Sequence, residues 1–173
     1  MSFPIHFVSA LELVLVEIRT CSRKLIVGVC YRPPSTSPTF VNDLHDVIHM
    51  ITVRYPSSPF ILLGDFNFPN IVWSNVSSYC EPFSSECDMF LNLCSDFNLS
   101  QLVTQATRIS PTASNILDLV LTTSPDFFQP ISYLPGLSDH LLLHFALTCA
   151  VPHQRNHSKY IHDYKNADFD AIN

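Results

Sequence analysis

Short apolar runs that end at proline or polar turn residues constrain the fold of this chain most strongly. Apolar side chains alternate over residues 11–18, which predicts a strand. A second run rich in Ile and Val, residues 24–31, follows a polar turn at 21–23, so the two runs predict a β-hairpin. The Arg-Pro-Pro sequence at 32–34 ends the second run, because proline cannot donate to a strand ladder.

Two segments have helical spacing instead. Apolar residues recur every three or four positions from Phe40 to Arg54, with residues 35–37 as the expected cap. A second helix is expected after Ser84, where serines precede acidic residues, and it continues to Phe97.

Further strands complete the expected core. They are residues 60–63, 102–103, 116–121 and 141–147. Residues 126–136 are expected to form a proline-bounded connection, and the polar residues 151–173 a linker or tail outside the domain of residues 1–150. Strands mixed with helical connections predict an α/β or α+β class with a mixed sheet.

Composition excludes several classes of protein. The chain of 173 residues is 47% hydrophobic and 14% charged, the opposite of a disordered chain. A formal net charge of −6 argues against a basic protein that coats nucleic acid, although a compact site that handles phosphate through a metal ion stays possible. No apolar run approaches the roughly 18 residues of a membrane span, so no membrane partner is expected.

The six cysteines form no Cys-x-x-Cys pair, which disfavours zinc-ribbon and thioredoxin-like folds. Cys80, Cys87 and Cys94 recur every seven residues. We expect reduced thiols acting as small apolar residues on one helix face, rather than a row of ligands. With no export signal, an intracellular location is expected.

Acidic, amide and imidazole side chains stand beside the apolar strands. They are Asp65, Asn67, Asp118, Asp139 and His140. Asp118 lies inside an apolar run, where an unpaired charge is costly and needs a partner or a role, unless its side chain faces solvent. Asp65 and Asn67 could equally be turn residues, and Asp139 part of a cap. Their order, with 53 residues from Asp65 to Asp118 and 21 more to Asp139, is more specific than any single motif.

Four motifs in this order resemble a known family. The sequences at 62–67 (LLGDFN) and 137–140 (LSDH) are similar to the two C-terminal signatures of the endonuclease/exonuclease/phosphatase family. YRPP at 31–34 and NILDLVL at 115–121 narrow the resemblance to the endonuclease domain of non-LTR retrotransposon polyproteins, upstream of reverse transcriptase. The resemblance covers residues 11–150.

This resemblance implies a partial four-layer sandwich of two mixed β-sheets flanked by helices. Residues 1–150 would be the C-terminal portion of the domain. The family's earlier strands, one ending in Asn and one in a metal-binding Glu, have no counterpart, since Glu12 and Glu17 lie in the strand directly before Tyr31. We therefore expect an N-terminally truncated domain with exposed apolar surface and weak or no activity.

The resemblance also implies roles for single residues. Asp65 would orient or deprotonate the attacking water, and Asn67 would donate to the scissile phosphate. Asp139 would approach Mg²⁺ or Mn²⁺. His140, oriented by Asp118, would contact a phosphate oxygen. Phosphodiester hydrolysis needs an activated water and countercharge, and Mg²⁺ suits it because it keeps waters and binds few carboxylates.

Three more residues are weaker candidates. Tyr31 would lie near the phosphate or the leaving oxygen, with an ordinary strand aromatic as the alternative. Arg108 and Asn115 would contact nucleic acid, with a solvated arginine equally compatible for Arg108.

The expected function is metal-dependent phosphodiester hydrolysis by a DNA-nicking retrotransposon endonuclease. Its partners would be transiently bound DNA and the reverse transcriptase of a parent polyprotein, and it would be nuclear when acting on DNA. The alternatives are an inactive relic or interaction domain of the same partial fold, and a phosphatase of the same family. A metal-binding tail at His153, His157 and His162 is disfavoured, because Pro152 does not favour the helix it needs.

Overall fold

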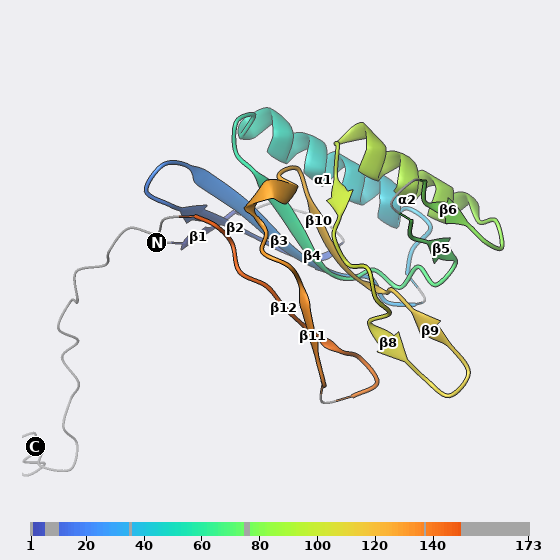
Figure 1. Cartoon of the computed structure of the whole chain (residues 1–173). Helices are drawn as coiled ribbons and strands as arrows, with labels where there is room; N and C mark the ends of the chain where they lie inside the picture. The colour runs from blue at the N-terminus through green and yellow to red at the C-terminus, as the bar shows by residue number, and fades with distance from the viewer. Residues whose placement is uncertain (1, 6–10, 35, 75–76, 137, 150–173) are drawn as a thin grey trace, which may run out of the picture.

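A six-stranded mixed sheet forms the centre of the computed structural model, which describes residues 2–5, 11–34, 36–74, 77–136 and 138–149 (Figure 1). The β3–β4 pair is parallel and the other pairs are antiparallel. In spatial order the strands are β1 (Ser2–Pro4), β2 (Glu12–Arg19), β3 (Lys24–Tyr31), β4 (Phe60–Asp65), β10 (Asp118–Thr122) and β7 (Ser100–Gln101). The predicted hairpin and the mixed α/β class are confirmed.

Two helices cover one face of this sheet (Figure 1). They are α1 (Phe40–Arg54) and α2 (Ser85–Asp96), and their apolar stripes join the inward side chains of the strands in one core. The first helix has the predicted bounds, but its N-cap is Thr39 rather than residues 35–37, of which Ser35 lies outside the described residues. Ser37 instead accepts the Phe40 N–H through its carbonyl oxygen.

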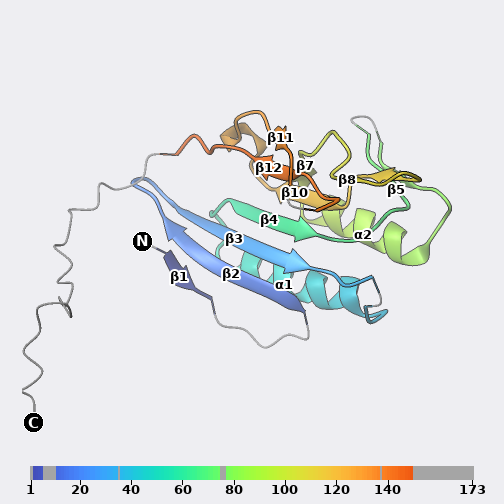
Figure 2. The ribbon, with the colours of Figure 1, turned by 90° about the horizontal axis from the view of Figure 1, so that it is seen from below.

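A hairpin lies on the other side of the sheet, beside β10 (Figures 1 and 2). It consists of β11 (Ser132–Leu134) and β12 (Leu142–His144). This layer sits at one end of the strand order, and within the described part of the chain it does not extend over β2 and β3 (Figure 2). Helices, central sheet and hairpin thus form part of a layered sandwich.

One row of side chains shows how uneven this cover is. Val14, Val29, Leu63 and Val120 are register partners across four strands and point to the side away from the helices. Val120 is 1% exposed, whereas Val29 is 53% and Val14 64% exposed. The apolar exposure expected from the resemblance is therefore present on β2 and β3.

Several short elements were not predicted. They are β5 (Ile71–Val72), β6 (Tyr79–Cys80), β8 (Arg108–Ile109), β9 (Ser114–Asn115) and the 3-10 turn η1 (Pro125–Phe127). Cys80 lies in β6, so the expectation of three cysteines on one helix face is wrong, although Cys87 and Cys94 are buried on α2. All six cysteines are free thiols.

Strand ends also differ from expectation. The strand predicted at 60–63 runs on to Asp65, and the strand predicted at 116–121 begins at Asp118. Both acids are thus terminal strand residues, because backbone pairing between β4 and β10 continues past the apolar side chains. The strand predicted at 102–103 is wrong, because the strand there is β7 at residues 100–101. The connection predicted at 126–136 overlaps the end of η1 and contains β11. The strand predicted at 141–147 is shorter and is β12.

The expected tail at 151–173, including its three histidines, lies outside the described residues. Among the described residues, no helix is long and apolar enough to cross a membrane.

Candidate active site

A row of four polar side chains crosses one end of the central sheet. Register partners Glu12, Tyr31, Asp65 and Asp118 stand on β2, β3, β4 and β10. Because partners in a sheet point to the same face, all four project to the side away from the helices. Tyr31 is 44% exposed beside Asp65 in register. The row lies at the carboxyl ends of the parallel pair β3–β4, which is the usual edge for binding sites in such sheets.

Gly64 lets the backbone deliver Asp65 to this edge. Its φ is 141°, and a Cβ there would lie 1.7 Å from the Cys30 carbonyl oxygen, so only glycine fits. The chain then turns through Asn67, whose φ of 47° is left-handed. The Asn67 backbone N–H donates to Asp65 Oδ1 at 3.1 Å, and the fully buried Phe66 anchors the turn.

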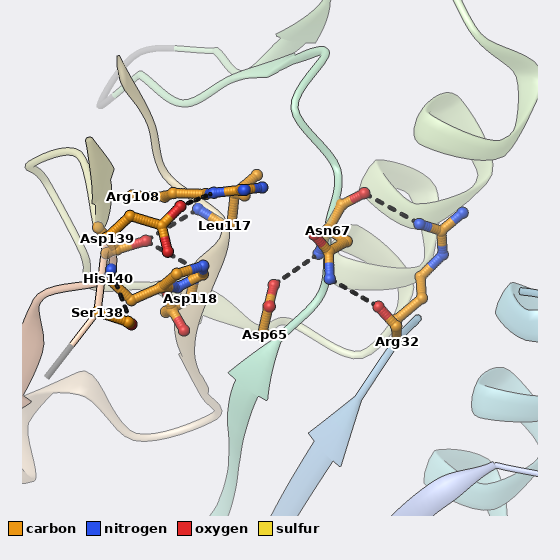
Figure 3. Close-up of polar contacts among 10 residues, drawn as sticks. Arg32, Asp65, Asn67, Arg108, Leu117, Asp118, Ser138, Asp139 and His140 are labelled. Carbon is orange, nitrogen blue, oxygen red and sulfur yellow. Dashed lines mark hydrogen bonds and ion pairs between the residues drawn. The ribbon is translucent and has the colours of Figure 1, made fainter. Parts of the chain in front are cut away.

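Asp118 and His140 form the second part of the site. His140 Nδ1 lies 2.8 Å from Asp118 Oδ2 (Figure 3). An ionised carboxylate can only accept, so Nδ1 carries the proton and Nε2 stays free for another partner. Buried Thr107 fixes the start of β10, because its hydroxyl oxygen accepts the N–H groups of Leu117 and Asp118 at 3.1 and 2.9 Å.

The two parts converge on one cluster. One ligand atom each from Asp65, Asp118 and His140 lies within 4.8 Å of the others. Burial raises the pKa of Asp65 above its usual range, and the nearby Asp118 charge adds to this despite the opposing hydrogen bond from Asn67. Crowded carboxylate oxygens of this kind fit a hard divalent cation such as Mg²⁺, which prefers oxygen ligands and would relieve the repulsion.

Asp139 stands apart from this cluster. Its carboxylate accepts from Arg108 Nε at 2.7 Å, and both side chains are about half exposed (Figure 3). The hydrogen bond from Arg108 holds the pKa of Asp139 below its usual range. The Asp139 carboxylate, to which the resemblance gives a metal-binding role, is therefore paired with Arg108 in this structure.

Arg32 is a site residue to which sequence reasoning gave no role. Although 7% exposed, it reaches Glu86 on α2. It also forms two hydrogen bonds with Asn67 (Figure 3). The YRPP motif could have identified Arg32 as a site residue. Glu86 could not be distinguished from any other acidic residue in the first turn of a helix, and no sequence motif pointed to Thr107.

A cavity of about 340 Å³ opens between these groups and the β8–β9 hairpin. Arg32, Asn67, Arg108 and Asn115 are among its lining residues. The two residues expected to contact nucleic acid, Arg108 and Asn115, therefore line the same cavity as Asn67. Of the acids in the motifs, Asp65 and Asp118 belong to the cluster, whereas Asp139 pairs with Arg108.

Comparison with known proteins identifies the family of this chain. A family model described as endonuclease-reverse transcriptase matches residues 25–144. The chain therefore belongs to that endonuclease-reverse transcriptase family, within the endonuclease/exonuclease/phosphatase group. No curated protein matches it in sequence.

Three solved structures are similar to this chain at low sequence identity, and the first of them shares its fold. The endonuclease domain of TRAS1, a telomere-specific non-LTR retrotransposon, is 16% identical with a TM-score of 0.60, over 78% of this chain and 61% of that one. The human Nocturnin catalytic domain is 17% identical with a TM-score of 0.47, over 86% and 59%. A family protein from Leptotrichia buccalis is 15% identical with a TM-score of 0.49, over 84% and 61%. The chain thus spans about three fifths of the length of these structures.

Proposed function

We propose that this chain is the hydrolytic part of a retrotransposon endonuclease that nicks one strand of DNA with the help of Mg²⁺ or Mn²⁺. The observation that carries the proposal is the convergence of Asp65, Asp118 and His140 at one sheet edge. The three come from chain segments separated by 53 and 22 residues, and hydrolysis needs a base, a cation site and a group beside the phosphate in one place.

Asp65 is the proposed base. Its raised pKa makes it a stronger proton acceptor than an ordinary aspartate, while the hydrogen bond from the Asn67 N–H keeps one oxygen fixed. The other carboxylate oxygen is then available to orient a water for attack on phosphorus. A bound cation would supply charge neutralisation for the phosphate, and Asp139 is the residue that would hold it.

His140 is the proposed contact to a non-bridging phosphate oxygen. Asp118 holds the ring with Nδ1 toward the sheet, so Nε2 is the atom available to the substrate. Asn67 would donate through its side-chain amide, and Tyr31 would lie beside the leaving oxygen. Arg108 and Asn115, at the cavity next to Asn67, are the proposed contacts to the flanking nucleic acid.

We further propose that nicking by this chain alone is slow. The resemblance calls for a metal-binding Glu, and among the described residues no glutamate belongs to the carboxylate cluster. Glu17 is committed to Arg19 and Lys24, and Asp139 to Arg108. With a formal net charge of −6, DNA affinity would come mainly from other parts of a polyprotein.

The test is conversion of supercoiled plasmid to open circles by the purified chain, with and without Mg²⁺. The same preparation is offered p-nitrophenyl phosphate, a phosphomonoester. We expect slow Mg²⁺-dependent nicking and no monoester hydrolysis. Monoester hydrolysis without nicking would support a phosphatase instead, and the absence of both activities would support a relic or interaction domain.

A further inference from the structure

Arg32 is the most extensively bonded buried charge near the candidate site. It follows the last residue of β3, and its backbone N–H donates to the Asp65 carbonyl oxygen at 2.9 Å. The parallel pairing of β3 with β4 thereby continues to the end of β4. Its side chain is 8% exposed, and a charge this deeply buried needs a partner.

Glu86 supplies that partner. Arg32 Nη2 lies 2.8 Å from both carboxylate oxygens of Glu86, which is in the first turn of α2. The guanidinium carbon lies 4.2 Å from the ring centre of Phe68 and 5.5 Å from that of Phe40, so the plane is held between rings and carboxylate. Arg32 Nε is buried and has no hydrogen-bond partner among the residues that the structure describes.

Two further bonds join Arg32 to Asn67. Arg32 Nη1 donates to the Asn67 carbonyl oxygen at 2.9 Å, and Asn67 Nδ2 donates to the Arg32 carbonyl oxygen at 2.8 Å (Figure 3). A backbone carbonyl can only accept, so this contact fixes which end of the Asn67 amide carries nitrogen. A hydrogen bond from the Asn67 side chain also acts on Asp65, where it opposes the rise in the pKa of that carboxyl.

We propose that Arg32 is a positioning residue that sets the conformation of Asn67, and through the β4 backbone that of Asp65. Arg32 bonds both the backbone carbonyl and the side-chain amide of Asn67, whose φ is left-handed. Glu86 fixes the position of the guanidinium. The arrangement is poorly explained by stability alone, because a buried ion pair with an unsatisfied Nε is weak evidence for net stabilisation.

Lysine cannot substitute in this role. Its single ammonium is a point donor on a flexible stem, whereas the planar guanidinium reaches Glu86 and the Asn67 carbonyl at once. Arg32→Lys therefore keeps the charge and loses the geometry. Glu86→Gln keeps the shape of the partner and weakens its hold on the guanidinium.

The experiment follows the side-chain amide of Asn67 by NMR in the ¹⁵N-labelled 173-residue chain. Its signals are assigned from their loss in Asn67→Asp. We expect both Arg32→Lys and Glu86→Gln to shift them toward the values of a free amide, with less effect from Glu86→Gln. The control Arg54→Lys, at the solvent-exposed end of α1, leaves them unchanged.

Melting curves separate positioning from folding. Shifts in variants that still unfold cooperatively near the wild-type temperature support the proposal, and if Arg32→Lys does not fold, Glu86→Gln alone decides. Unchanged Asn67 side-chain signals in a folded Arg32→Lys or Glu86→Gln variant would overturn the proposal. Shifts that occur only in a variant that has lost the chemical-shift dispersion of a folded protein would also overturn it.

The kinetic part of the proposal rests on the proposed function. If the wild type nicks plasmid, Arg32→Lys should lower kcat by about tenfold or more with KM changed by less than about twofold, since misplacement of a reacting group affects the chemical step. An unchanged kcat would overturn positioning. Absence of wild-type nicking contradicts the proposed function, while the NMR result still decides the role of Arg32.

Discussion

His140 Nδ1 and Asp118 Oδ2 lie 2.8 Å apart, although 22 residues separate them in the chain. An isolated β-bridge between Arg108 and His140 brings the histidine to the start of β10, and Thr107 fixes the backbone of Asp118. The imidazole is therefore held in one tautomer by a carboxylate that is itself held by the sheet.

Replacing Asp118 with Asn removes the acceptor that selects this tautomer. The amide can donate to Nδ1 and favour the opposite tautomer, so Nε2 would carry the proton. We expect nicking to fall by about 10²- to 10⁴-fold, the scale seen when an orienting aspartate is amidated in other hydrolases, with the fold retained. Plasmid nicking and ¹⁵N NMR of the His140 ring measure the two effects. A variant with the wild-type rate would contradict the role of Asp118.

Asp65→Asn should stabilise the protein near neutral pH. The raised pKa of Asp65 means that the folded state holds its proton more tightly than the unfolded state. Stability of the wild type therefore falls as pH rises from the ordinary aspartate pKa through the raised one, and the loss is complete above it. We expect Tm of the variant to exceed that of the wild type by a few degrees at pH 7, with the difference shrinking below about pH 4. A Tm difference that grows on acidification would be the opposite result.

Arg108→Met should strengthen binding of a divalent cation. The substitution frees the Asp139 carboxylate, which now accepts from Arg108 at 2.7 Å, and removes a positive charge near Asp65. Isothermal titration of Mn²⁺ into the folded chain should show affinity several-fold above that of wild type, with Arg54→Met as the matched control for lost charge. Equal affinity in the Arg108 and Arg54 variants would show that the ion pair does not compete with the metal.

Gly64→Ala should be more destabilising than Gly28→Ala. A Cβ on Gly64 meets the backbone oxygen of Cys30 at 1.7 Å, and the φ of 141° is strained for any other residue. At Gly28 the nearest atoms are side-chain carbons of Leu15 and Leu62 at 2.9 Å, which can shift. We expect about 1–3 kcal/mol for overpacking at Gly28 and a larger loss at Gly64, from urea unfolding of both variants. Equal losses would mean that β3 and β4 can separate at this point.

Much of this architecture was predictable, because the period of the apolar residues decides which segments form strands and which form helices. The hairpin of β2 and β3 and the bounds of α1 followed from alternation and helical spacing alone. The two-residue strands such as β8 and β9 did not, since they depend on backbone bonds to distant segments, such as that from Ile109 to Asp139.

The convergence of the motif residues and the contact of His140 with Asp118 were predictable, but the other pairings at the site were not. Motif order brought forward Asp65, Asp118 and His140, which meet within 4.8 Å. No sequence pattern indicated that Asp139 would pair with Arg108, or that Glu86 would reach across to Arg32, because such contacts depend on where hairpins and helices pack.

The central claim is that the cluster around Asp65 is the hydrolytic centre, and the most direct test is the plasmid-nicking rate of Asp65→Ala beside that of the wild type. Both proteins are assayed at equal concentration with Mg²⁺, and CD spectra verify folding. The account predicts nicking by the wild type that falls to the no-enzyme background in the variant. Nicking by Asp65→Ala at the wild-type rate would contradict it.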